Sequence, residues 1–238
     1  MRPWAYFTYL TNDQTNAFTD DAGALHLLKL MQLADSALPI GSAAHSFGLE
    51  TLVAEERLTV DALPEFLRDY LAETGTVDAA FCRAAYRLAG ADDELTAQWF
   101  TLTQQVSARK PAQESRTASL TLGRRMMRLF LALENARDPG VEAHYSMAFG
   151  YVGGILEVSE LLTVAAYLQQ TTAGLVSACQ RLLPLGQQHA ARLLWELKPA
   201  ILEIALVADL PADAQSFTPM VDMASMRHVE LRTRLFVS

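Results

Sequence analysis

The chain has 238 residues, to which alanine and leucine contribute 37 each, whereas valine and isoleucine contribute only 13 and 4. Unbranched helix formers thus greatly outnumber the β-branched residues that buried strands need, which excludes a β-sandwich, a barrel or a parallel sheet and predicts an all-α protein. With 19 Lys and Arg against 27 Asp and Glu, the formal net charge of −8 argues against a nucleic-acid binder, because phosphate contacts require a basic surface.

The N-terminal part of the chain divides into an arm and two predicted helices. Residues 1–23 are polar with weak periodicity, and we interpret them as a flexible arm. Apolar residues then recur at helical spacing until Pro39 and Gly41 interrupt them. Beyond this loop, Ser42 is placed to cap a second helix over residues 43–56.

The rest of the chain has the pattern of a series of helices with short connectors. Thr59 is placed to cap the first of them, Gly75 to end it, and Pro199 is expected to kink the last. The predicted helices cover residues 60–74, 76–90, 92–108, 111–135, 142–152, 158–169, 172–183 and 186–207. Residues 24–212 are therefore expected to form a single, bundle-like domain of about ten helices.

The absence of targeting, membrane-spanning and disulfide patterns in the sequence indicates the cellular compartment and the state of the cysteines. Only Arg2 is basic among the first 20 residues, so no signal peptide is expected. The longest charge-free run, residues 161–180, contains too many polar side chains for a bilayer span. Cys82 and Cys179 form no CxxC pair or disulfide framework and are expected to be buried thiols. The pattern indicates a soluble, cytoplasmic protein without membrane contact.

Residues 213–238 form a tail whose composition is unusual for a chain end, since Met223, Met226, Leu235 and Phe236 alternate there with arginines. Two interpretations remain open. The tail either docks on its own domain or is ordered by a partner, because methionines and aromatics are favoured at adaptable interfaces. We take the second as the working hypothesis.

The usual enzyme motifs are absent. The sequence has no GxGxxG or GxxxxGK[ST] loop, no HExxH and no GxSxG, and its five histidines are scattered singly. We therefore expect no catalytic residue, no cofactor and no metal site. One alternative is a helical metal-dependent enzyme in which folding gathers His45, Glu50, His144 and His228. Another is a generic helical scaffold.

Two further features each have two interpretations. Residues 109–128 carry five arginines and one lysine against the single acid Glu114, which fits a solvated helix face or a docking strip for an acidic partner. Gly153 and Gly154 lie inside an apolar helical pattern, where paired glycines weaken a helix unless another helix packs closely against them. That helix can belong to the core or to a second copy, and we favour the core.

Five segments together resemble the UreF family of urease accessory proteins. The first is Leu-Met-Gln-Leu-Ala-Asp-Ser-Ala-Leu-Pro-Ile-Gly at 30–41, followed by His-Ser-Phe-Gly-Leu-Glu at 45–50. The others lie, in the family's order, at 114–124, 144–150, 176–187 and 222–238. Any one of these motifs is weak, but the ordered set covers the chain from about residue 25 to its end and is specific.

This resemblance implies an all-helical protein that is not itself an enzyme. UreF-like proteins join a complex that inserts nickel into urease apoprotein. In it they bridge the scaffold protein UreD, also called UreH, and the nickel-carrying GTPase UreG. The resemblance further implies a homodimer, a nickel-handling role through these partners and an influence on GTP hydrolysis.

The resemblance also implies where partners bind. The loop and helix start near residues 39–50 and the tail would contact the scaffold, and the dimer surface would help to receive the GTPase. The residues predicted to bind partners are Pro39, Gly41, His45, Ser46, Glu50, Arg116, Arg124, Met226, His228, Glu230, Arg234, Leu235 and Phe236.

Overall fold

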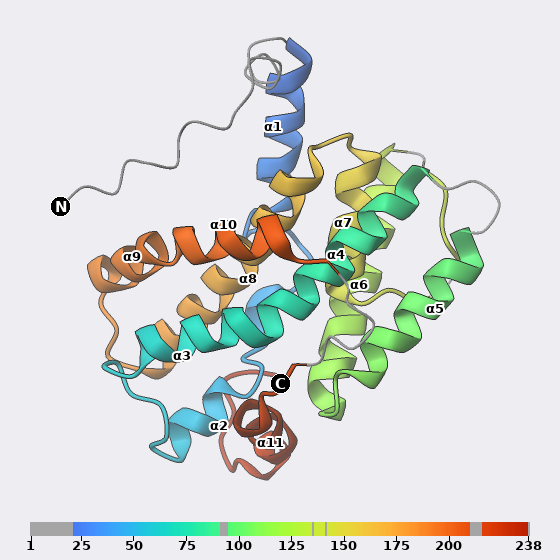
Figure 1. Cartoon of the computed structure of the whole chain (residues 1–238). Helices are drawn as coiled ribbons and strands as arrows, with labels where there is room; N and C mark the ends of the chain where they lie inside the picture. Colours follow the sequence, from blue (N-terminus) through green and yellow to red (C-terminus); the bar gives the residue numbers. More distant parts are fainter. Residues whose placement is uncertain (1–20, 91–94, 135, 141, 210–215, 238) are drawn as a thin grey trace.

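The computed structural model describes residues 21–90, 95–134, 136–140, 142–209 and 216–237, and within them the fold is all-α, as predicted (Figure 1). The α-helices are α1 Asp21–Leu33, α2 Leu49–Ala54, α3 Leu63–Tyr70, α4 Thr76–Arg87, α5 Leu95–Ala108, α6 Gln113–Glu134, α7 Tyr145–Ile155, α8 Glu160–Leu182, α9 Gln187–Glu196, α10 Lys198–Val207 and α11 Pro219–Arg227. Short 3₁₀ turns cover Ser42–Ala44, Leu88–Gly90 and His228–Glu230, and a π-helical turn covers Leu71–Gly75.

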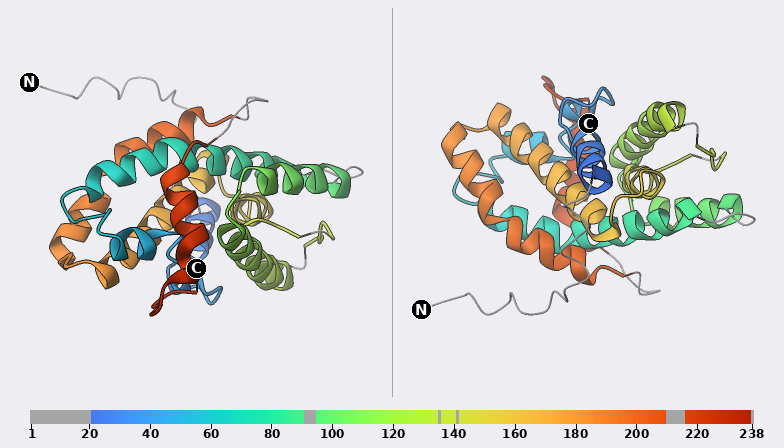
Figure 2. Two further views of the ribbon diagram at one scale, coloured as in Figure 1. Left: turned by 90° about the horizontal axis from the view of Figure 1, so that it is seen from below. Right: turned by 90° about the horizontal axis from the view of Figure 1, so that it is seen from above.

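Helix α7 is the centre of the core. It lies between α4 and α6 (Figure 2), and its residues from Tyr145 to Gly153 are all buried. Glycines allow this close packing, because a Cβ added to Gly150 would lie 1.8 Å from the carbonyl oxygen of Cys82 on α4. A Cβ added to Gly123 on α6 would lie 2.1 Å from the carbonyl oxygen of Ala143. Backbone thus packs directly on backbone where α7 meets α4 and where the residues just before α7 meet α6.

The Gly153-Gly154 pair serves the core, as expected. A Cβ at Gly153 would lie 2.3 Å from Cγ2 of Thr163 on α8, and a Cβ at Gly154 would lie 2.6 Å from Cβ of Ala89. Both glycines therefore let α7 approach neighbouring segments of the same chain.

The predicted second helix over residues 43–56 is wrong. A single 3₁₀ turn follows Gly41, His45 is extended, and α2 begins only at Leu49. Phe47 and Gly48 adopt positive φ angles of 51° and 89°, which no α-helix accommodates. The chain therefore turns sharply at Gly48 before α2.

The predicted break at Gly75 is also wrong. Gly75 has helical angles, φ −60° and ψ −43°, and α3 continues through the π-turn into α4 without a stop. A Cβ at Gly75 would approach Leu71 Cδ2 to 3.2 Å and Leu168 Cδ2 to 3.5 Å, so the glycine makes room for neighbouring leucines instead of ending a helix.

Two predicted helices over residues 158–183 are one 23-residue helix, α8. The polar stretch that suggested a boundary is accommodated inside it, because the hydroxyls of Thr171 and Thr172 donate to the carbonyls of Tyr167 and Leu168 one turn earlier. The single helix predicted over residues 186–207, with a kink at Pro199, is instead two helices, α9 and α10, which meet at Leu197, and Pro199 lies in the first turn of α10.

At the N-terminus, α1 begins at Asp21, three residues inside the segment assigned to the arm. The rest of that arm, residues 1–20, lies outside the described residues, as does the start of the tail at 213–215. Cys82 and Cys179 are both free and buried, as expected.

Substituting Gly150 should sharply destabilise the protein. In Gly150→Ala the new methyl group meets backbone of α4, which cannot move aside as a flexible side chain would, so we expect a loss of about 3 kcal/mol or more of unfolding free energy. The matched control is Gly174→Ala in α8, where nothing lies within 4 Å of the new Cβ and stability should rise by up to about 1 kcal/mol. Urea denaturation measures both, and equal effects would contradict the close contact of α4 and α7.

Candidate functional site

The C-terminal tail is bound to the body of the protein by one buried carboxylate. Glu50, at the start of α2, accepts hydrogen bonds from the backbone N–H of Leu235 at 2.6 Å and of Phe236 at 3.2 Å. It also pairs with Nε2 of His228 at 2.8 Å. Three groups of the tail thus converge on a carboxylate that is only 6% exposed, where hydrogen bonds to a charged acceptor are strong.

His228 lies between two acids. Its Nε2 faces Glu50, while its Nδ1 lies 3.3 Å from a carboxylate oxygen of Glu114 on α6. The ring is fully buried, so α2, α6 and the end of α11 meet at this side chain. In the sequence Glu114 was the lone acid of a basic stretch and the first residue of the 114–124 motif, but nothing there pointed to its partner, which lies 114 residues away.

Arg181 holds the last described residues of the tail. Its guanidinium stacks over the ring of Phe236, 4.1 Å from the centroid, and donates to the backbone oxygens of Leu235 and Ala43. Next to it, the N–H of Val237 donates to the carbonyl of Ala44 at 2.8 Å. The tail end is therefore fixed to the 43–44 turn and to α8.

Helix α11 packs on Gly48. A Cβ there would lie 2.9 Å from the carbonyl oxygen of Val221 and 3.1 Å from the nitrogen of Ser225, and the positive φ angle independently requires a glycine. On the other side, the hydroxyls of Ser115 and Ser225 are 2.6 Å apart, which ties α11 to α6. Arg227 and Glu55 add an ion pair nearer the surface.

The Pro39–Gly41 loop is clamped by α6. Arg125 donates to the carbonyl oxygen of Ile40 at 3.0 Å, and a Cβ on Gly41 would lie 2.4 Å from Nη1 of the same arginine. Gly41 also has a φ of +80°, a backbone conformation that favours glycine. Burial, with a smaller contribution from Arg125, lowers the pKa of the nearby His45.

The structure divides the residues predicted to bind partners into an internal set and a surface set. Ser46, Glu50, His228 and Phe236 are buried, His45 and Arg116 are half-buried, and Pro39, Gly41, Arg124, Met226, Glu230, Arg234 and Leu235 are exposed. Glu50, His228 and Phe236 bind the tail to its own domain, so the self-docking interpretation of the tail describes this conformation. Only the surface members remain candidates for direct partner contact.

The tail presents an apolar face to the solvent. Met223, Met226 and Val229 are 46%, 47% and 57% exposed, and Leu235 is 57% exposed. These side chains come from a segment that buried polar contacts hold in place. An ordered, exposed apolar surface of this kind is typical of a protein-binding site.

The basic stretch of α5 and α6 is mostly engaged within the chain. Lys110 pairs with Asp78, Arg116 donates to the carbonyl of Lys110, and Arg124 pairs with Glu142. Among the six basic residues of this stretch, Arg128 alone has no partner in the described part of the chain. The structure thus favours a helix face with internal partners over a free docking strip.

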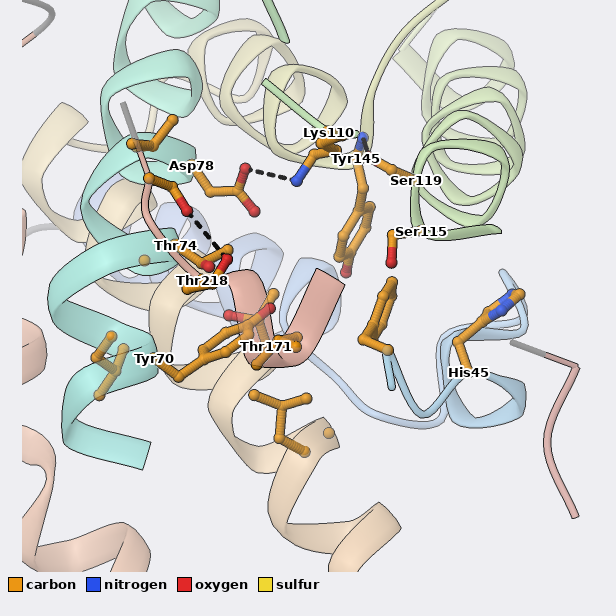
Figure 3. A pocket seen from close by; sticks show the side chains of 18 of the residues that line it. His45, Tyr70, Thr74, Asp78, Lys110, Ser115, Ser119, Tyr145, Thr171 and Thr218 are labelled. Carbon is orange, nitrogen blue, oxygen red and sulfur yellow. Dashed lines mark hydrogen bonds and ion pairs between the residues drawn. The ribbon is translucent and has the colours of Figure 1, made fainter. Parts of the chain in front are cut away.

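A cavity of about 110 Å³ lies beneath α11 (Figure 3). Asp78 on α4 accepts from Lys110 Nζ and from the hydroxyl of Tyr167, each at 3.0 Å, and Tyr70 also lines this space. Burial, reinforced by Asp78 and Asp222, raises the pKa of Tyr70, so its hydroxyl stays protonated. Sequence reasoning missed this cluster, since its members come from helices far apart in the chain.

The four-residue metal site of the alternative hypothesis does not form. Glu50 and His228 pair, but His144 is held by the hydroxyls of Ser107 and Ser119, and the His45 ring packs against Phe47. Over the described ranges, no cluster of three or more His, Cys, Asp or Glu is arranged to bind a metal ion. No helix within these ranges is long and apolar enough to cross a membrane.

Removing the Glu50 carboxylate should release the tail. In Glu50→Ala the two tail amides lose their acceptor, so amide hydrogen exchange of Leu235 and Phe236 should speed up at least tenfold. The control Glu65→Ala, on the exposed side of α3, should leave both rates unchanged. Equal protection of the two amides in Glu50→Ala and the wild type would contradict the anchoring role.

His144 should make the protein less stable in acid. Burial, with a contribution from the charge of Lys110, lowers the pKa of this fully buried ring from 6.5 to about 4. In the unfolded chain the ring takes up a proton at its usual pKa of 6.5, whereas in the folded protein it takes up a proton only near pH 4. The unfolding free energy therefore falls as the pH drops through this window, by about 3 kcal/mol from this residue. Denaturant titrations should show a smaller fall in His144→Gln, and parallel curves would overturn the assignment.

Comparison with known proteins agrees with the motifs. The UreF family model matches residues 58–198. The urease accessory protein UreF of Nostoc sp. (strain PCC 7120) is 34% identical over 226 residues, which cover 90% of this chain and 96% of that protein. Proteins of the same name from Bacillus sp. (strain TB-90) and Mycobacterium sp. (strain JLS) are 31% and 32% identical, each over 89% of this chain and 99% of the relative. The chain therefore belongs to the UreF family of urease accessory proteins.

Proposed function

We propose that this protein is a non-enzymatic adaptor in the complex that inserts nickel into urease apoprotein. In this role it bridges a UreD/UreH-type scaffold and a UreG-type GTPase, modulates GTP hydrolysis, and acts in the cytoplasm as a homodimer. Family membership supports the urease-maturation context. The observation that carries the adaptor role is the exposed apolar face of the anchored tail.

The scaffold is the proposed partner of this face. Met223, Met226 and Val229 lie on the outside of a segment whose buried side, at Ser225 and His228, is fixed to the domain. Because the tail is already ordered, binding to a partner would not cost the conformational entropy of ordering it. The exposed Glu230 and Arg234 are suited to polar contacts at the rim.

Introducing negative charge on the tail face should strongly weaken scaffold binding. In the double variant Met226→Glu, Val229→Glu, the scaffold's apolar surface would have to bury two carboxylates, so we expect at least a hundredfold weaker binding in a pulldown or calorimetric titration. The matched control is Phe100→Glu, Leu133→Glu, whose side chains are comparably exposed on α5 and α6. Loss of binding in both variants, or in neither, would contradict the assignment.

The function itself is tested by reconstitution. Apo-urease supplied with nickel, GTP, the scaffold and the GTPase should gain activity only when this protein is added, and the tail variant should fail where the control variant succeeds. Full activation in the absence of this protein would refute the adaptor role.

A further inference from the structure

The cavity beneath α11 is partly open to solvent, and most of its lining is apolar. Its walls include the buried side chains of Val77, Val106, Leu122 and Leu175, which come from α4, α5, α6 and α8. The volume of about 110 Å³ is somewhat smaller than that of an apolar protein cavity of about 150 Å³ that binds benzene. The space is therefore matched to one small ring.

The charged side chains at this cavity already have partners. Lys110 and Asp78 pair with each other at 3.0 Å, Arg109 donates to a carbonyl oxygen of α5, and Asp222 accepts from a hydroxyl of the tail. Burial lowers the pKa of His45, so its ring is neutral at pH 7. A charged guest would leave water without gaining an unpaired opposite charge, which favours a neutral guest.

One buried amide at the cavity has an unused donor. Gln170 on α8 lines the space and is only 7% exposed. Its Oε1 accepts from the hydroxyl of Tyr145 at 2.7 Å, whereas its Nε2 has no hydrogen-bond partner in the described part of the chain. This nitrogen is not fully enclosed by protein atoms. Leaving a buried donor unpaired is costly, so a guest that offers an acceptor is favoured.

We propose that this cavity is a binding site for a small, neutral ring compound that carries one hydrogen-bond acceptor. The ring packs against the apolar walls, and the acceptor takes the free N–H of Gln170. Because Val221 of α11 also lines the space, such a ligand contacts both the core and the tail. The site is distinct from the exposed tail face and does not depend on the proposed adaptor role.

The test is an NMR titration of the full chain with two neutral probes of nearly the same shape. Benzonitrile has a nitrile nitrogen that accepts a hydrogen bond, whereas phenylacetylene has a C–H group in that place. We expect both probes to shift the methyl signals of Val77 and Val106, and benzonitrile alone to shift the side-chain N–H signals of Gln170. Benzonitrile should bind about fivefold more tightly, because only this probe pairs with the amide.

Substitutions locate the bound probe. Thr171, whose side chain borders the cavity in Figure 3, donates to a carbonyl oxygen one turn earlier in α8. In Thr171→Phe a ring occupies part of the space, so benzonitrile should bind about tenfold or more weakly. The matched control is Thr101→Phe, because the exposed Thr101 makes the same kind of bond within α5, and its affinity should stay unchanged. Gln170→Met removes the donor, so the two probes should bind it equally.

The absence of saturable shifts at Val77 and Val106 with either probe would overturn the proposal. Equal affinity of the two probes for the wild type would do the same, since the acceptor defines the class of ligand. Undiminished binding to Thr171→Phe would place the probe elsewhere and also refute the site. Backbone amide signals report whether each variant is folded, and the wild-type comparison is decisive even if a variant unfolds. Scaffold binding is measured separately, so failure here leaves the adaptor role unaffected.

Discussion

A carboxylate removed from water is tolerated only when hydrogen-bond donors replace the water, and much of this structure follows from how Glu50 meets that requirement. Its donors are two backbone amides and one imidazole, all from the tail. The acid therefore depends on the tail being docked, and the tail depends on the acid. Two segments 178 residues apart in the chain are in this way made into one structural unit.

This dependence changes the meaning of the motifs in the first and last parts of the chain. Gly41 and Gly48 shape a loop that admits Arg125 on one side and α11 on the other. The hydrogen-bonded pair of Glu50 and His228 then joins the start of α2 to the end of α11. The surface that results carries Met226 and Val229 outward, so the internal contacts and the proposed docking face are two sides of the same segment.

Composition and apolar spacing were enough to predict an all-α fold and helices such as α5 and α6. Composition and spacing were not enough to predict the structural role of individual glycines. Gly48 adopts a left-handed φ angle that interrupts the helix predicted over residues 43–56. Gly75, in contrast, has helical angles and makes space for neighbouring leucines. Whether a glycine serves conformation or packing depends on residues distant in the sequence.

The site shows the same limit. Motifs located Glu50, His228 and Phe236, but their contacts with one another depend on the fold, so they were expected at a partner interface instead of inside the protein. Arg181 and Glu114 were missed as site residues because their partners lie on other helices. What the sequence could indicate was which segments matter, and what it could not indicate was which side of each segment faces inward.

The π-turn at Leu71–Gly75 gives the junction of α3 and α4 a particular sensitivity to chain length. Each residue of a helix rotates the following part by about 100°, so removing one residue here would turn α4 by that angle relative to α3. Asp78 would then leave the space that it shares with Tyr70, and the α4 surface that meets α7 would rotate away. We infer that substitutions at the exposed position Ala72 are tolerated far more readily than insertions or deletions in this segment, since the number of residues aligns the two helices.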